Sequence, residues 1–278
     1  MAGKLLEYSG LVTKVRAMSG RLLRREDFER ITEFQTVQET ISFLREQESY
    51  GKIYGGREEI KHRGQVEELI HNSVMEDYRK LWRFANSRQR RAMELYLEQL
   101  TCRDSSKKVD ASYFTRVWKE IEEFPDRQTR RVLREIFGTQ IDWLNIMWIY
   151  RARHFFHQEP EAAAEMLIPV RYKLRREETS GLLEAEGHEE FLRILGAASY
   201  CRGRDALVRI EDEISYHYVM GKMYRRLCRR YPFSIAPVYC YFYEKEQEIE
   251  HLTTALEGIR YQLAPKDIRE MILLHALA

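Results

Sequence analysis

The sequence predicts an all-α fold with no significant β-sheet. Glycine and proline together account for only 20 of the 278 residues, whereas the typical share is about 12%. Apolar residues recur at steps of three and four, and no segment shows the strict alternation of a half-buried strand. A chain of this length can also bury roughly 75% of its unfolded surface. We therefore expect long helices around a large core.

The first helices can be placed in order along the chain. Apolar residues at helical spacing run through 8–22 and again through 66–81. Between these stretches, Thr36 is followed three residues later by Glu39, a capping-box pattern that predicts the start of a helix. The serine- and lysine-rich segment 102–110 is the best loop candidate.

The second half continues the helical pattern. Segment 127–153 is strongly helical, with Gly138 as the expected break, and Pro160 and Pro169 then mark a looser region extending to Gly187. Proline at the first turn of the last helix places its start at Pro265. The remaining expected helices cover 113–121, 189–198, 205–230 and 242–263.

Two weak internal similarities indicate a duplicated helical unit. The first relates Ile41, Leu44 and Tyr50 to Phe191, Ile194 and Tyr200 at one constant spacing. The second relates the segment from Tyr113 through Asp142, Asn145 and Arg151 to the segment from Tyr218 through Glu246, Glu248 and Leu252. Repeated helical units are typical of scaffolds, because each unit buries its apolar face against a neighbour. We expect one domain over 1–278, with approximate repeats near 1–100, 101–200 and 201–278.

Charge and cysteine usage exclude several classes of protein. The 46 basic and 44 acidic residues give a net charge of +2, which is unlike the one-sided basic excess of a nucleic-acid-binding surface. No secretory signal and no Cys-x-x-Cys spacing is visible, so we expect a reducing, cytoplasmic setting. No stretch approaches the ~18 apolar residues of a transmembrane helix. The four cysteines are Cys102, Cys201, Cys228 and Cys240.

No catalytic or metal-binding set stands out, so we expect no catalytic residue, no cofactor and no metal. The sequence has no glycine-rich phosphate-binding loop, which argues against nucleotide binding by this chain. Glu248 and His251 have the Glu-x-x-His spacing of a di-iron site, but such a site needs a second motif of this kind. His154 and His157 are best interpreted as polar side chains beside an aromatic pair.

Polar residues interrupt the most apolar part of the chain at Asp142, Asn145 and Arg151. Asp142 and Asn145 share a helix face at i and i+3 and can bind a neighbouring arginine. We expect a structural role in which at least two of the three residues are buried and hydrogen-bonded within the chain, because buried polar groups must be hydrogen-bonded. Contact with a partner protein is the alternative.

Three stretches resemble the C subunit of the V/A-type rotary ATPases, whose eukaryotic relative is the d subunit. The first runs from Tyr8 through Arg16-Ala-Met to Leu22-Leu23, with Lys14 where the family usually has arginine. The second is Gly138-Thr-Gln-Ile-Asp142-Trp-Leu-Asn145 through Arg151-Ala-Arg153, with Gln140 in place of an acid. The third runs from Tyr241 through Lys245-Glu246-Gln-Glu248-Ile249 to Leu252, and continues through Gly258 to Pro265-Lys-Asp-Ile268-Arg.

The resemblance implies a non-catalytic rotor subunit in a funnel-like assembly of helical units. Such a protein lies on the cytoplasmic face of the membrane proteolipid ring and receives the central shaft, which the D and F subunits form, with one copy per complex. It couples the shaft to the ring during ATP-linked transport of H⁺ or Na⁺ and binds neither nucleotide nor nucleic acid. The alternative, on the residues alone, is a helical-repeat scaffold of another cytoplasmic complex.

Overall fold

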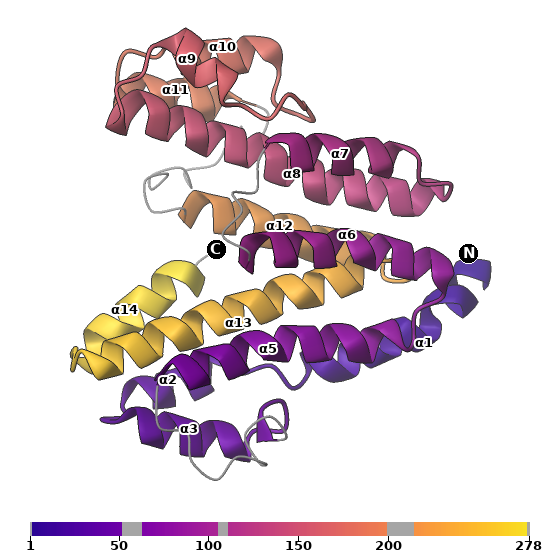
Figure 1. The fold of residues 1–278 in the computed structure, drawn as a ribbon, viewed down its shortest axis with the longest axis vertical. Helices are drawn as coiled ribbons and strands as arrows, with labels where there is room; N and C mark the ends of the chain where they lie inside the picture. The colour runs from indigo at the N-terminus through magenta and orange to yellow at the C-terminus, as the bar shows by residue number, and fades with distance from the viewer. Residues whose placement is uncertain (1, 52–62, 105–110, 199–213, 277–278) are drawn as a thin grey trace. The chain divides into compact units, whose positions relative to one another are not determined.

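A computed structural model describes residues 2–51, 63–104, 111–198 and 214–276 of the protein (Figure 1). Every regular element in these residues is a helix, which confirms the all-α prediction. The chain divides into two compact units, one formed by residues 1–90 with 227–277 and the other by 91–226. Helices α6 (Ser87–Asp104) and α12 (Ile214–Arg230) each begin in one unit and end in the other.

Unit 1 is built around the long helix α13 (Ala236–Arg260). Its remaining helices are α1 (Ala2–Ser19), α2 (Arg25–Thr32), α3 (Val37–Glu46), α5 (Arg63–Trp82) and α14 (Pro265–Ala276). All five contact α13, and α14 turns back along it after a short turn (Figure 1). The core of this unit therefore combines helices from both ends of the sequence.

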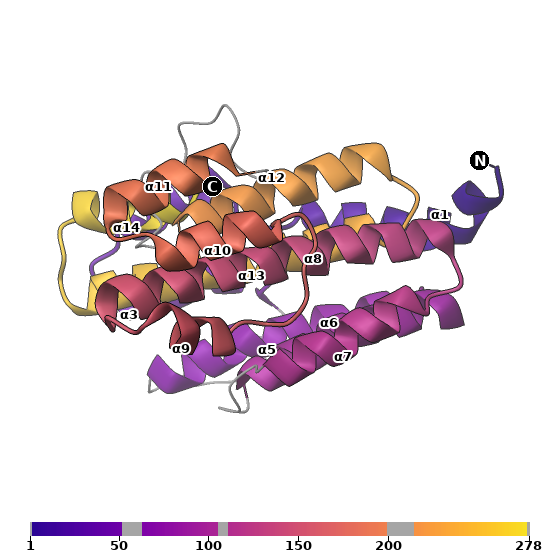
Figure 2. The same cartoon turned by 90° about the horizontal axis from the view of Figure 1, so that it is seen from above.

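Unit 2 is built around the long helix α8 (Arg127–Tyr150), which continues into the π-helical turn η1 (Arg151–Phe155). The other elements are α7 (Ala111–Glu122), α9 (Pro160–Glu165), α10 (Arg176–Glu184) and α11 (His188–Ala197). Helices α7, α9 and α10 contact α8, and α11 packs on α10 (Figure 2). The aromatic and aliphatic core of this unit includes Trp143, Ile146, Leu182 and Phe191.

Local sequence explains where several helices begin. The Asp126 side chain accepts a hydrogen bond from the Thr129 backbone N–H at 2.8 Å and thereby caps α8. Thr36 caps α3 by accepting from the Glu39 N–H, as predicted. The Glu39 carboxylate accepts from Gln35, one residue before the position that a capping box uses.

Gly138 does not break α8, contrary to the sequence-based expectation. The helix continues through it, and a Cβ atom at this position would lie 2.4 Å from Cγ of the Tyr172 ring. The glycine is therefore explained by the close approach of an aromatic side chain. The segment after Pro160, expected to be loose, contains α9 and α10.

The two units repeat the same turn after their long helices. Tyr150 and η1 lead to His157, and α13 leads to Gln262; these two residues have positive φ values of 50° and 54°. Each is followed three residues later by a proline that opens a helix, Pro160 for α9 and Pro265 for α14. The spacing between the two copies is thus the same, 105 residues, at both positions.

Each unit also contains a helical hairpin with matching caps. Before α2 the Arg24 N–H donates to the Asp27 carboxylate, and before α10 the Arg175 N–H donates to the Glu178 carboxylate. The second helices of the hairpins, α3 and α11, are both 10 residues long. These features give a spacing of 151 residues between the two copies, so Leu44 corresponds to Leu195.

The predicted duplication is therefore present, with its register corrected by one residue from the expected pairing of Leu44 with Ile194. Tyr200 lies outside the described residues, and the arrangement of three repeats near 1–100, 101–200 and 201–278 stays a prediction.

Candidate functional site

Asp142 is a buried carboxylate in the middle of α8, only 1% exposed. It accepts three backbone hydrogen bonds from the segment that leads into α10, from the N–H groups of Tyr172 (3.2 Å), Lys173 (2.7 Å) and Leu174 (3.0 Å). Hydrogen bonds to an ionised group are about twice as strong as neutral ones. Asp142 therefore fixes the start of the α10–α11 hairpin to the central helix.

Asn145 lies one turn further along the same face of α8. Its side-chain Nδ2 donates to the Ile168 carbonyl at 3.1 Å, and its Oδ1 accepts from the Ile168 N–H at 2.9 Å. The side-chain amide thus bonds both the carbonyl and the N–H group of one residue, Ile168. Together, Asp142 and Asn145 hold the segment 168–174 along α8, and we call these two residues with that segment the unit 2 cluster.

Arg151 is not part of the unit 2 cluster. It is exposed at the first position of η1. Asp142 and Asn145 are buried, so the expectation that at least two of the three residues are buried is confirmed. The charged neighbours of the cluster instead surround Glu135 on α8. There the Glu135 carboxylate is bridged by Arg226 and, at 3.8 Å, by Lys173.

Two titrating groups in the unit 2 cluster, Tyr172 and Lys173, have shifted pKa values. Burial, with the negative charge of Glu135 as a further cause, raises the pKa of Tyr172 to about 12. Burial also lowers the pKa of the Lys173 amine, because the charged ammonium loses hydration.

Unit 1 places a buried ion pair at the corresponding part of α13. The Lys245 amine donates to Glu248 Oε1 at 2.6 Å and to the Tyr50 hydroxyl at 2.8 Å, and it lies 4.1 Å from the centre of the Tyr50 ring. The Tyr50 hydroxyl also donates to Glu248 Oε1 at 2.6 Å. All three side chains are buried, Lys245 being 1% exposed.

The second oxygen of Glu248 accepts the backbone N–H of Leu23 at 2.5 Å, in the turn before α2. We call Tyr50, Lys245 and Glu248, with this Leu23 N–H, the unit 1 cluster. It joins the central helix to both ends of the α2–α3 hairpin region. Because Glu248 is occupied in this way and the His251 ring packs edge-on against Phe28, the Glu-x-x-His pattern is structural.

The two clusters are equivalent by the internal repeat. Leu23 and Leu174 each donate their N–H to the carboxylate of the central helix, and they are 151 residues apart, which is the spacing of the hairpins. Sequence reasoning selected Asp142 and Glu248 but missed Tyr50 as a partner of Glu248. The signal was present, since Tyr50 closes one of the two similar segments, in the turn after α3.

A second buried pair of unit 1 was missed as well. The Tyr241 hydroxyl donates to Asp77 at 2.5 Å, and the Lys80 amine bonds the same carboxylate at 2.8 Å. Burial is the main cause that raises the pKa of Tyr241, and the Asp77 charge raises it further. This pair ties α13 to α5.

The remaining motif residues lie apart from the clusters. Arg16 is exposed on α1, where its guanidinium lies 5.9 Å from the centre of the Phe233 ring. Glu246 is half-buried on α13, next to Lys245 but on a different face. In the described residues the motif therefore separates into two buried clusters and positions outside them.

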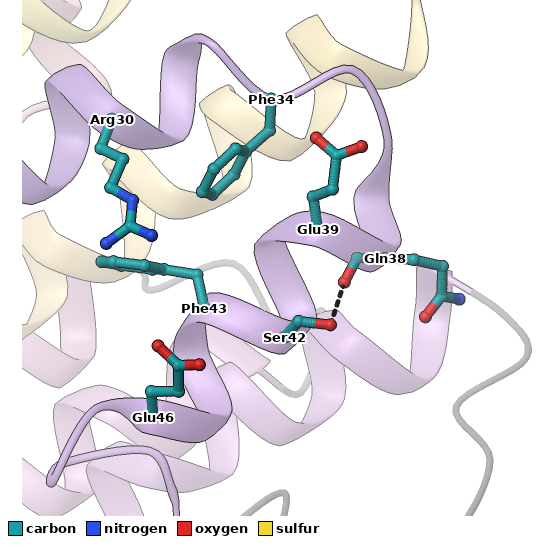
Figure 3. A pocket seen from close by; sticks show the side chains of 7 residues that line it. All are labelled: Arg30, Phe34, Gln38, Glu39, Ser42, Phe43 and Glu46. Carbon is teal, nitrogen blue, oxygen red and sulfur yellow. Dashed lines mark hydrogen bonds between the residues drawn. The ribbon is translucent and has the colours of Figure 1, made fainter.

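A shallow pocket of about 290 Å³ lies between α2 and α3 (Figure 3). Phe34 and Phe43 form its apolar part, with ring centres 5.9 Å apart, and the Arg30 guanidinium lies 5.1 Å from the Phe43 ring. Its rim carries Glu39 and Glu46. The mixed charge of the lining shows no preference for one class of ligand.

The described residues contain no group of three or more His, Cys, Asp or Glu side chains placed to hold a metal ion. Among the same residues, no helix combines the length and hydropathy that crossing a bilayer requires.

Comparison with known families decides the assignment. The family model described as ATP synthase (C/AC39) subunit matches residues 11–104 and 103–271. The chain belongs to this family. A search of curated proteins finds no match. The C/AC39 assignment agrees with the resemblance of the three motif stretches to a V/A-type ATPase component, and both buried clusters lie inside the matched residues. Membership of this family associates the chain with an ATP synthase complex and therefore with ion transport.

Proposed function

We propose that this C/AC39 family member is the non-catalytic central-stalk rotor subunit of a V/A-type rotary ATPase. In this role it couples the shaft, which the D and F subunits form, to the proteolipid ring and lies at the cytoplasmic membrane surface as a peripheral component. One copy is present per complex. The observation that carries the proposal is the family match over nearly the whole chain.

The buried clusters support a role in transmitting torque. A coupling element must resist deformation between the shaft and the ring, and each long helix is joined to its hairpin by a buried carboxylate. A buried carboxylate that loses its partners is costly, so the hairpin cannot shift without a large penalty. Stiffness of this kind serves mechanical coupling and needs no active site.

Copurification and pumping assays on the intact complex test the proposal. We expect one copy of the chain per complex, and we expect membranes lacking it to lose ATP-driven ion pumping. ATP hydrolysis by the detached catalytic head should persist, because that head does not contain this chain.

Loss of hydrolysis in the detached head on deletion of the chain would contradict a rotor role. Stable association with a complex that has neither shaft nor ring would instead favour the scaffold alternative.

A further inference from the structure

Two thiols of unit 1 lie in contact where α12 leads into α13. Cys228 is the third-last residue of α12, and Cys240 lies in the first turns of α13. Both cysteines are free, and their side chains are hydrogen-bonded to each other. The two residues are 12 positions apart in the sequence, so no short cysteine motif announces them. The turn between the helices is what brings the two sulfur atoms together.

The connection between α12 and α13 is itself held by hydrogen bonds. The Ser234 hydroxyl donates to the Tyr231 carbonyl at 2.8 Å and accepts from the Ala236 N–H at 3.0 Å. The Tyr231 N–H donates to the Leu227 carbonyl at 2.8 Å and closes the last turn of α12. A disulfide forms without backbone movement only between side chains that the backbone already brings close. This connection therefore supplies the first requirement for a bond between the two sulfur atoms.

The two thiols differ in exposure and in their neighbours. Cys228 is half-buried and reachable from solvent, whereas Cys240 is only 8% exposed. The Cys240 S–H donates to Glu244 Oε1 at 3.5 Å, one turn further along α13, and Glu244 is exposed. The hydrogen bond with Cys228, followed by burial, raises the pKa of the Cys240 thiol. Cys240 therefore keeps its proton until a base removes it, and the carboxylate that already accepts its hydrogen bond belongs to Glu244.

We propose that Cys228 and Cys240 form a dithiol site that a hydroperoxide oxidises to an intrachain disulfide. With hydrogen peroxide, the Cys228 sulfur attacks one peroxide oxygen, the O–O bond breaks, and Cys228 becomes a sulfenic acid with release of water. The Cys240 sulfur then attacks the Cys228 sulfur, so that the S–S bond forms and the S–O bond breaks. The Cys240 proton passes to Glu244 and on to the leaving hydroxide. Two thiols and one peroxide thus give one disulfide and two waters.

The disulfide responds to oxidant and is reversible. In the reducing setting that we expect for this chain, both sulfur atoms are thiols at rest. Small thiols restore them by thiol–disulfide exchange at the more accessible sulfur, that of Cys228. While it lasts, the bond fixes the last turn of α12 to α13, the central helix of unit 1. The inference concerns unit 1 alone and does not depend on the proposed function.

Peptide mapping of the full-length chain tests the proposal. The reduced protein is treated with hydrogen peroxide, its remaining thiols are alkylated, and the tryptic peptides are identified by mass spectrometry. Trypsin cleaves after Arg229, so a Cys228–Cys240 disulfide appears as a pair of joined peptides. We expect this linkage after peroxide and its loss after treatment with dithiothreitol. Full alkylation of both residues after peroxide, or a linkage of either one to Cys102 or Cys201, would overturn the proposal.

Serine variants of the same chain separate the roles of the two thiols. In Cys240→Ser the sulfenic acid of Cys228 has no thiol to react with, so it should accumulate and be labelled by dimedone, a reagent for sulfenic acids. In Cys228→Ser the buried Cys240 should stay unlabelled. Equal labelling of Cys240 contradicts the order of the two steps. Because the linkage is also mapped in the unaltered chain, the proposal stays testable if a serine variant does not fold.

A glutamine variant tests the proton acceptor. Glu244→Gln should slow the appearance of the disulfide by about tenfold or more, because a positioned base accelerates proton removal by at least this much. Labelling of Cys228 by dimedone in the Cys240→Ser chain should be unchanged by the same substitution. Glu257→Gln, on α13 but more than three turns from Glu244, is the matched control and should leave the rate of disulfide formation unchanged. An equal rate in both glutamine variants contradicts the proton route through Glu244.

Discussion

The unit 1 and unit 2 clusters solve one structural problem with different chemistry. In both, a carboxylate on the central helix accepts the backbone N–H that precedes the helical hairpin. Unit 1 neutralises that carboxylate with the buried amine of Lys245, whereas unit 2 surrounds it with backbone N–H groups. The position of the buried carboxylate is thus the same in both units, whereas its partners come from whichever chain segment lies nearby.

The difference between the clusters predicts unequal sensitivity to mutation, with the largest effect at Lys245. Lys245→Met keeps much of the aliphatic stem but leaves Glu248 buried without its cation. The free energy of unfolding should fall by about 3–5 kcal/mol, measured by urea denaturation. Adding Glu248→Gln should recover part of the loss, because it removes the unpaired buried charge and the single amide oxygen still accepts from the Leu23 N–H, while the amide NH₂ donates to the Tyr50 hydroxyl. A single variant as stable as the parent would show that the ion pair is dispensable.

Unit 2 should lose less when its carboxylate is removed. Asp142→Ala leaves the N–H groups of Tyr172, Lys173 and Leu174 without their acceptor, and we expect a cost on the order of 1–3 kcal/mol. Amide hydrogen exchange at Tyr172, Lys173 and Leu174 should be faster in this variant than in the parent protein. Asp142→Asn retains one acceptor oxygen and should cost less than the alanine variant. The same loss from both variants would mean that charge, rather than the number of acceptors, decides stability here.

Two glycines extend the comparison to side-chain packing. A Cβ at Gly138 would lie 2.4 Å from Cγ of Tyr172, and one at Gly258 would lie 2.6 Å from Cγ1 of Ile268. Gly138→Ala should destabilise by about 1–3 kcal/mol. Gly258→Ala should cost less, because the three nearest atoms lie 2.6, 3.0 and 3.3 Å from its Cβ, against 2.4, 2.7 and 2.8 Å at Gly138. Thermal melts of both variants test the order. Tyr172→Ala should rescue Gly138→Ala in a double-mutant cycle.

The smallest effect is expected in alkaline solution. Because the pKa of Tyr172 rises from 10.0 to about 12 on folding, the folded state retains a proton that the unfolded state loses above pH 10. The contribution of Tyr172 to the free energy of unfolding is therefore constant below pH 10. Between pH 10 and 12 it falls, because the unfolded state is increasingly favoured. Tyr172→Phe should reduce this slope in melting temperature against pH. A slope identical to that of the parent protein would assign the effect to other groups, including Tyr241.

The fold class and the central helices could be predicted from the sequence because helical spacing is a local signal. The caps at Thr36 and Asp126 and the start at Pro265 are likewise local. The prediction for Gly138 was wrong, because the reason for a glycine there is the Tyr172 ring, 34 positions away in the chain. The spacing of the duplication was off by one residue, since buried leucines and isoleucines substitute for one another, whereas backbone caps define the register directly.

The candidate site shows the same division between local and distant information. Asp142 and Glu248 could be selected because a charge inside an apolar helix is conspicuous. Their partners could not be derived, because Leu23 and Tyr50 lie 225 and 198 residues from Glu248 in the sequence. The backbone donors before α10 carry no side-chain signature. Arg151 shares the motif but lies at the helix terminus, so proximity in the sequence was a poor guide to its environment.

The π-turn η1 also has a consequence for how this chain tolerates changes in length. One residue inserted into a regular α-helix turns everything beyond it by about 100°, which would take Pro160 and α9 away from the face they pack on. A single π-turn absorbs the extra residue within five positions, so the downstream helix keeps the orientation seen in the sister unit. Deleting one residue from 153–156 should therefore convert this end into an ordinary α-helical terminus and leave the α9 packing intact. The helix end is a place where the length of the chain can change by one residue without a change of fold.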